Sequence, residues 1–167
     1  MNWEISIQSK ERISKFLLFL LRVVIGALFV YSGFSKLIRP IEYFEVAVAQ
    51  YDVIPDFLTH YLCSMVPWIE LIGGAYLFLG YQIPISGGVL VFLTGVFQVA
   101  LAQALLRKLP MDECGCFGGN SIHLSLYQSF VMDTMIVIGL IYLSTSENSF
   151  LLSLDNAFLE RKSEDAN

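Results

Sequence analysis

Four stretches of almost uninterrupted apolar residues divide the chain. They cover residues 16–35, 62–81, 83–106 and 124–143. As a helix rising about 1.5 Å per residue, each crosses the hydrocarbon core of a bilayer, which is roughly 30 Å thick. Apolar side chains surround each stretch instead of forming one stripe, so lipid fits better than a one-sided soluble core. The pattern predicts an all-α protein, an integral membrane bundle of four transmembrane helices.

The more polar segments divide the chain further. Residues 1–15 form an N-terminal flank, residues 16–143 the four-helix domain, and residues 144–167 a polar and amphipathic tail. The first apolar stretch has no small-residue cleavage site after it, so we interpret it as a retained signal anchor. Residues 41–51 predict a short helix in the first loop. Pro67 is expected in the first turns of the second long helix, where its missing N–H does least harm.

The composition supports a membrane protein. Hydrophobic residues make up 56% of the chain and charged residues only 15%, against about 25% in ordinary soluble domains. The mean hydropathy is +0.64. No block rich in lysine or arginine suggests nucleic acid as a partner. The lipid bilayer is therefore the first expected partner.

Basic residues near the helix ends predict the orientation. Lys10, Arg12 and Lys15 precede the first apolar stretch, whereas the loop of residues 37–61 is mainly acidic. Because basic residues stay on the cytoplasmic side, both termini are expected in the cytoplasm. In a bacterial inner membrane, both long loops would then face the periplasm, where disulfides persist.

Charged residues within the apolar stretches are candidates for function. Glu70 and Asp133 are each predicted about two turns, roughly 12 Å, below the outer helix ends, and Lys36 ends the first stretch. An intramembrane charge is costly and needs a partner or a wet cavity. We expect Glu70 to pair with Lys36, either as a structural ion pair or as part of a proton-handling site that includes Asp133. Arg22 lies in the inner half and is interpreted as a packing or snorkelling residue.

Three cysteines offer a second kind of chemistry. Cys114 and Cys116 flank a glycine in the third loop, and Cys63 begins the second long helix on the same predicted side. A Cys-Gly-Cys disulfide would close a small, strained and therefore oxidising ring, or Cys63 could pair with one of the two. The alternatives are a metal bound by both thiolates with His123 or Asp112, and inert thiols or an inert disulfide. The acidic neighbours favour an accepting disulfide over a reactive thiolate.

Four motifs together resemble one known family. They are RVVIG at residues 22–26, FVYSGFSKL at 29–37, PWIELIGG at 67–74 and DECGCFG at 112–118. They are similar to the methylamine utilisation protein MauE family, which groups with the DoxX-like four-helix membrane proteins. The resemblance implies a redox-associated bundle linked to maturation of periplasmic methylamine dehydrogenase. It also implies Cys114 and Cys116 as the redox pair and Arg22, Lys36 and Glu70 as buried charges.

These observations predict a membrane-embedded thiol–disulfide redox protein. Its partner would be a periplasmic thioredoxin-like or disulfide-containing protein, and a membrane quinone is the candidate cofactor. Candidate catalytic residues are Cys114, Cys116, Cys63 and Glu70, and no metal is expected. The alternatives are a non-catalytic membrane assembly factor with a structural disulfide, and a small metal- or solute-handling membrane protein.

Overall fold

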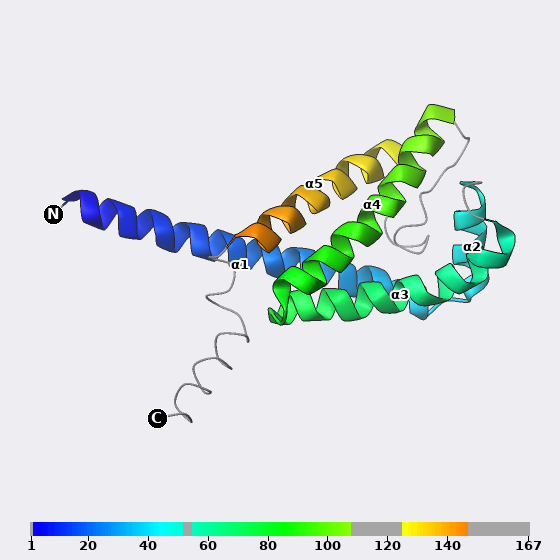
Figure 1. Ribbon diagram of the computed structural model, residues 1–167, viewed down its shortest axis with the longest axis horizontal. Coiled ribbons are helices and arrows are strands. Elements are labelled where there is room, and N and C mark those ends of the chain that lie inside the picture. Colours follow the sequence, from blue (N-terminus) through cyan, green and yellow to red (C-terminus); the bar gives the residue numbers. More distant parts are fainter. Residues whose placement is uncertain (1, 52–54, 108–124, 147–167) are drawn as a thin grey trace, which may run out of the picture.

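The structure is a computed structural model that describes residues 2–51, 55–107 and 125–146. In this part of the chain all regular elements are helices (Figure 1). They are α1 (Asn2–Leu37), α2 (Ile41–Ala49), α3 (Asp56–Leu79), α4 (Ile83–Arg107) and α5 (Leu126–Thr145). The all-α prediction is confirmed, as is the short helix in the first loop, which ends at Ala49.

Within the described residues, four helices are long and apolar enough to cross a membrane. The spanning segments are Arg12–Leu37, Phe57–Leu79, Ile83–Arg107 and Leu126–Thr145. Large apolar side chains point outward along them, such as Phe92 with 74% and Met135 with 67% of their surface exposed. In water this would be an aggregating surface, whereas in a bilayer it faces lipid. The chain is therefore a multi-pass membrane protein.

The start of α3 differs from the prediction. The helix begins at Asp56, six residues before the apolar stretch, because polar Thr59 and His60 continue the same helical turns. Pro67 consequently lies inside the helix instead of in its first turns. Glu70 lies about 21 Å along α3 from Asp56, since each residue adds about 1.5 Å. Glu70 therefore lies about four turns from the start of its helix, instead of the predicted two.

Close backbone contact holds α1 against α3, and the two helices run side by side in Figure 1. A Cβ atom added at Gly33 would lie 2.6 Å from the carbonyl oxygen of Pro67, and one at Gly74 2.7 Å from Phe29 Cβ. Gly26 meets Phe78 in the same way, at 2.7 Å. Glycine is required at these positions because any side chain would push the helices apart.

The second pair consists of α4 and α5. Gln98 donates a hydrogen bond of 2.6 Å to the Thr134 hydroxyl between them. The helix α5 begins with a capping box, in which the Ser125 hydroxyl accepts from the Gln128 N–H and the Gln128 side chain accepts from the Ser125 N–H. A Cβ atom added at Gly88 or Gly95 on α4 would meet no other atom within 4 Å among the described residues, so neither glycine marks a helix contact there.

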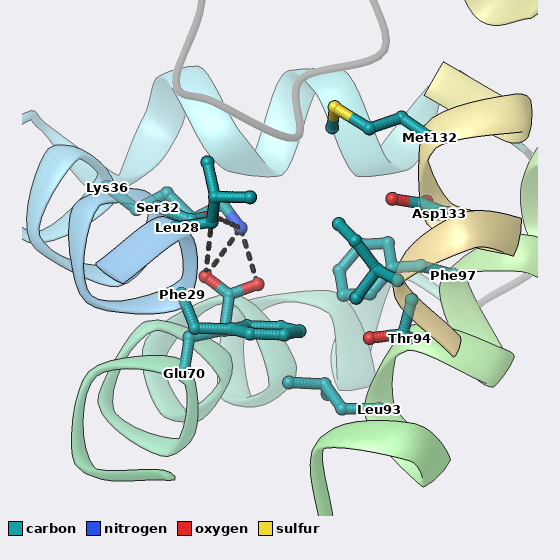
Figure 2. A pocket seen from close by; sticks show the side chains of 11 residues that line it. Leu28, Phe29, Ser32, Lys36, Glu70, Leu93, Thr94, Phe97, Met132 and Asp133 are labelled. Carbon is teal, nitrogen blue, oxygen red and sulfur yellow. Dashed lines mark hydrogen bonds and ion pairs between the residues drawn. The ribbon is translucent and has the colours of Figure 1, made fainter. Parts of the chain in front are cut away.

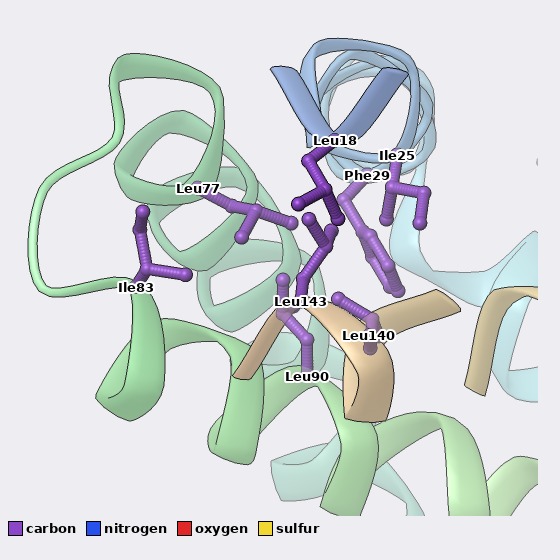
Figure 3. Packing of buried hydrophobic residues seen from close by; sticks show 8 residues of the cluster. All are labelled: Leu18, Ile25, Phe29, Leu77, Ile83, Leu90, Leu140 and Leu143. Atoms are coloured by element: carbon purple, nitrogen blue, oxygen red, sulfur yellow. The ribbon is translucent and has the colours of Figure 1, made fainter. Parts of the chain in front are cut away.

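The two pairs meet in an apolar core near the α3–α4 turn. Figure 3 shows this cluster, which contains Leu18, Ile25, Phe29, Leu77, Ile83, Leu90, Leu140 and Leu143. Away from this core the α4–α5 pair diverges from α1 and α3 toward the end that carries α2 (Figure 1). We call this the α2 end. Two smaller clusters close it, one around Tyr51 and Leu101 and one around Phe44 and Cys63.

A tight turn joins the two pairs and explains the buried Arg22. Gly80 ends α3 in the left-handed conformation, with φ of 74°, and the Tyr81 N–H donates back to the Tyr76 carbonyl at 2.9 Å. A Cβ atom at Gly80 would lie 2.5 Å from Arg22 Nη1. The guanidinium thus rests at the C-terminus of α3, where the helix dipole favours a cation. Because Arg22 is only 3% exposed, it is a packing residue and does not snorkel.

Candidate functional site

A buried ion pair joins α1 and α3 where the two helix pairs diverge. Lys36 Nζ lies 2.7 Å from both carboxylate oxygens of Glu70, and the two side chains are 2% and 6% exposed. The Ser32 hydroxyl donates to Glu70 at 3.1 Å and accepts from Lys36 at 3.2 Å. Ser32 and Lys36 are four residues apart on α1, so they share a helix face. The pairing predicted from sequence is confirmed.

Aromatic rings complete the surroundings of the ammonium group. Lys36 Nζ lies 5.0 Å from the ring centre of Phe44 on α2 and 5.6 Å from that of Phe97 on α4. Both distances are within the range of cation–π attraction. The charge is thereby held by a carboxylate, a hydroxyl and two ring faces, although it lies within apolar helices. Four helices contribute to this site, and α2 covers it.

A cavity of about 50 Å³ lies between the ion pair and the α4–α5 pair. Lys36, Glu70 and Ser32 form one wall, whereas Asp133 on α5 and Thr94 on α4 lie on the opposite side (Figure 2). The rest of the lining is apolar and consists of Leu28, Phe29, Leu93, Phe97, Met132 and Ile136. Asp133 is 8% exposed. The structure therefore brings Lys36, Glu70 and Asp133 around one space.

Cys63 lies on the other side of the ion pair. It forms no disulfide within the described residues, is 2% exposed, and packs with Phe44 and Val66 beneath α2. A second cavity of about 110 Å³ borders Cys63, and Lys36 lines this cavity as well as the first. The expectation that Cys63 begins the second long helix is wrong, since α3 extends two turns before it.

Cys114 and Cys116 lie outside the described residues, together with Asp112 and His123. The residues that border this segment are Arg107 at the end of α4 and Ser125 before α5. The apolar cluster of Tyr51, Leu101, Ala104 and Leu126 joins these helix ends at the α2 end of the bundle. Both ends of the segment thus start from the side on which Cys63 lies.

Arg22 does not belong to this site. It lies fourteen residues before Lys36 on α1, which places it about 21 Å away along the helix. Its partner is the C-terminal turn of α3 at Gly80, as described above. Of the buried charges predicted from sequence, three therefore gather around the cavity and one stabilises the opposite end.

Sequence reasoning missed Ser32, Thr94 and the ring of Phe97. Thr94 is 6% exposed, and its hydroxyl has no hydrogen-bond partner within the part of the chain that the structure describes. It is one of few polar residues in a charge-free apolar stretch, which is the signal that could have found it. Ser32 could have been found from its position one turn before Lys36.

Comparison with known proteins gives relatives of one kind. MauE of Paracoccus denitrificans, a methylamine utilization protein, is 31% identical over 108 residues, which are 63% of this chain and 56% of the relative. The protein of the same name from Paracoccus versutus is 31% identical over 97 residues, 58% of this chain and 52% of the relative. The chain thus spans about half the length of these curated relatives. No solved structure matches significantly.

The family comparison covers far more of the chain. Residues 14–146 match the model described as methylamine utilisation protein MauE. This range contains three of the four spanning segments, all but the first two residues of Arg12–Leu37, the Lys36–Glu70 pair and the cavity that this pair lines. The family predicted from the four sequence motifs is confirmed: the chain belongs to the MauE family of methylamine utilisation proteins.

Proposed function

We propose that this chain is a thiol–disulfide redox protein of the bacterial inner membrane that acts on a periplasmic partner. The family match and the names of the two relatives support a role in methylamine utilisation. The observation that supports the redox proposal is the position of Cys63. It is buried and shares a cavity lining with Lys36, at the end of the bundle where α4 ends and α5 begins. The basic N-terminal flank supports an orientation with both termini in the cytoplasm.

The proposed reaction is thiol–disulfide exchange. A thiolate of the partner attacks a disulfide formed by Cys114 with Cys116, or by one of them with Cys63, and displaces one thiolate of this chain. The partner's second thiolate then attacks the mixed disulfide and releases the other cysteine. The partner loses two electrons and gains a disulfide, while this chain gains both electrons and its two thiolates take up protons. Glu70 and Asp133 are the groups proposed to exchange protons with this site.

Cysteine trapping in membranes tests the proposal. A Cys114→Ser or Cys116→Ser variant should accumulate a mixed disulfide with a periplasmic protein, because in the reverse exchange the remaining thiolate attacks the oxidised partner and no neighbouring cysteine of this chain is left to release it. The band should disappear on reduction and should be absent from the Cys114→Ser/Cys116→Ser variant. Cys63→Ser is the matched control, and it distinguishes pairing within the Cys-Gly-Cys segment from pairing with Cys63. Full complementation of a deletion strain by the double variant would overturn the proposal.

A second candidate is a non-catalytic assembly factor. The completeness of the Lys36–Glu70–Ser32 network favours it, since every charge in this network already has its partners. In that case the double cysteine variant would support full activity, while disruption of the buried ion pair would reduce the amount of the protein in the membrane.

The quinone stays a prediction from sequence. The cavity beside Glu70 measures about 50 Å³, whereas an engineered cavity that binds benzene measures about 150 Å³. A quinone ring therefore does not fit this cavity, and no step through a quinone is assigned to it.

A further inference from the structure

The cavity between the helix pairs has an unusual lining for a void in an apolar bundle. Charged side chains face it from α1, α3 and α5, namely Lys36, Glu70 and Asp133, while α4 contributes the uncharged hydroxyl of Thr94. Figure 2 shows the Asp133 carboxyl group and the Thr94 hydroxyl directed into the space that the ion pair faces.

The size of the cavity decides what can occupy it. A water molecule needs about 10–15 Å³ by this measure and two to four polar partners. The cavity measures about 50 Å³, which is enough for a few water molecules and too little for an aromatic ring. Its polar groups lie on opposite walls, so water has partners on both sides.

The hydroxyl of Thr94 is separate evidence that the cavity holds a bound molecule. Its side chain is more than nine-tenths buried, lines the cavity, and has no hydrogen-bond partner for its hydroxyl among the described residues. A buried hydroxyl without a partner is destabilising, and in native structures such groups are usually satisfied by protein or ordered water. The space in front of this hydroxyl is the cavity itself.

We propose that this cavity binds water molecules that connect Thr94 and Asp133 to the Lys36–Glu70 pair. The water makes the two carboxyl groups, which lie on different helix pairs, parts of one hydrogen-bonded unit that stores and passes a proton. Thr94 acts as a positioning residue that holds the water. The water site stands apart from the redox reaction, whereas its use as a proton route rests on the proposed function.

Radiolytic labelling of the protein in lipid nanodiscs tests the water site. Hydroxyl radicals formed from bound water oxidise nearby methionine to its sulfoxide. Met132 lines the cavity, and Met135, about 4.5 Å further along α5, faces lipid and serves as the matched control. Met132 should be labelled several-fold more than Met135, less so in Thr94→Val and fully in Thr94→Ser. Equal labelling of the two methionines in the wild-type protein would overturn the water site.

Thermal unfolding gives a second readout, because valine has the shape of threonine without its hydroxyl. If water occupies the cavity, Thr94→Val loses a hydrogen bond and lowers Tm, whereas Thr94→Ser keeps it. If the cavity is dry, Thr94→Val removes an unsatisfied group and leaves Tm unchanged or higher. This second result would overturn the proposal.

The proton route is tested through the cysteines. After reduction and removal of the reductant, oxidised glutathione is added as the electron acceptor. The disulfide in membranes should then re-form, with release of two protons from the thiols, several-fold more slowly in Thr94→Val and at the normal rate in Thr94→Ser, as measured by alkylation. An unchanged rate in Thr94→Val would overturn the proton role. Failure of the cysteine trapping with retained labelling of Met132 would instead remove the redox function and leave the water site intact.

Discussion

The ion pair between Lys36 and Glu70 makes a quantitative prediction about stability. Both side chains are almost completely buried, and Nζ lies 2.7 Å from each carboxylate oxygen. In Glu70→Gln the ammonium group would lose its counter-charge inside the bundle. Removing one partner of a buried pair typically costs about 3–5 kcal/mol. We expect a loss of this size in the free energy of unfolding.

The assay is unfolding in mixed micelles with increasing SDS, followed by the helical circular dichroism signal. Glu45→Gln is the matched control, because Glu45 also contacts a basic group, His60 Nδ1 at 2.6 Å, but in an exposed pair. Exposed pairs contribute about 0–1 kcal/mol, so this variant should unfold almost like the wild type.

A double variant separates the pair from its surroundings. Lys36→Met with Glu70→Met replaces both charges by apolar groups of similar size, which is often neutral or stabilising for buried pairs. It should recover most of the stability lost in Glu70→Gln. The reasoning is refuted if Glu70→Gln costs no more than Glu45→Gln, or if the double variant is less stable than Glu70→Gln.

Three further predictions concern packing. Gly33→Leu should lower the free energy of unfolding by several kcal/mol or prevent assembly, because the new side chain would meet the backbone of α3. Gly88→Leu is the control and should be tolerated in the membrane. Protein yield and unfolding in SDS measure both effects. Cys63 of the folded protein in membranes should resist labelling by maleimide and should react in Phe44→Ala, which exposes the thiol. Equal reactivity in the two proteins would contradict the burial of Cys63 beneath α2. Gly80→Ala should lower Tm, since its φ of 74° and the adjacent guanidinium both oppose a side chain; an unchanged Tm would contradict this geometry.

Much of the fold follows from sequence because a bilayer imposes a simple rule. Every backbone polar group must be satisfied within the membrane, so an apolar stretch of about 20 residues becomes a helix. The error at α3 shows the limit of this rule. Residues 56–61 are too polar to be recognised as part of a span, yet they continue the helix beneath α2 and move Cys63 and Glu70 deeper along it.

For the buried charges too, some contacts follow from the sequence and others only from the structure. Because an isolated charge in lipid is costly, the sequence predicts that Lys36 and Glu70 form an ion pair, and the structure contains this pair. The same argument does not predict the surroundings of Arg22, whose guanidinium lies at the end of α3 beside Gly80. Helix termini carry charge through their backbone, which residue types alone do not reveal.

The sequence by itself determined the four spans, the family and the pairing of two charges, because hydrophobic length and charge cost act locally. Only the tertiary structure decided that Asp133 and Thr94 face the same cavity as this pair, and that Cys63 is covered by α2. The reason is geometric. The contacting faces of apolar helices depend on small residues such as Gly33 and on the divergence of the two helix pairs. A uniformly apolar sequence does not show which face of each helix makes the contact.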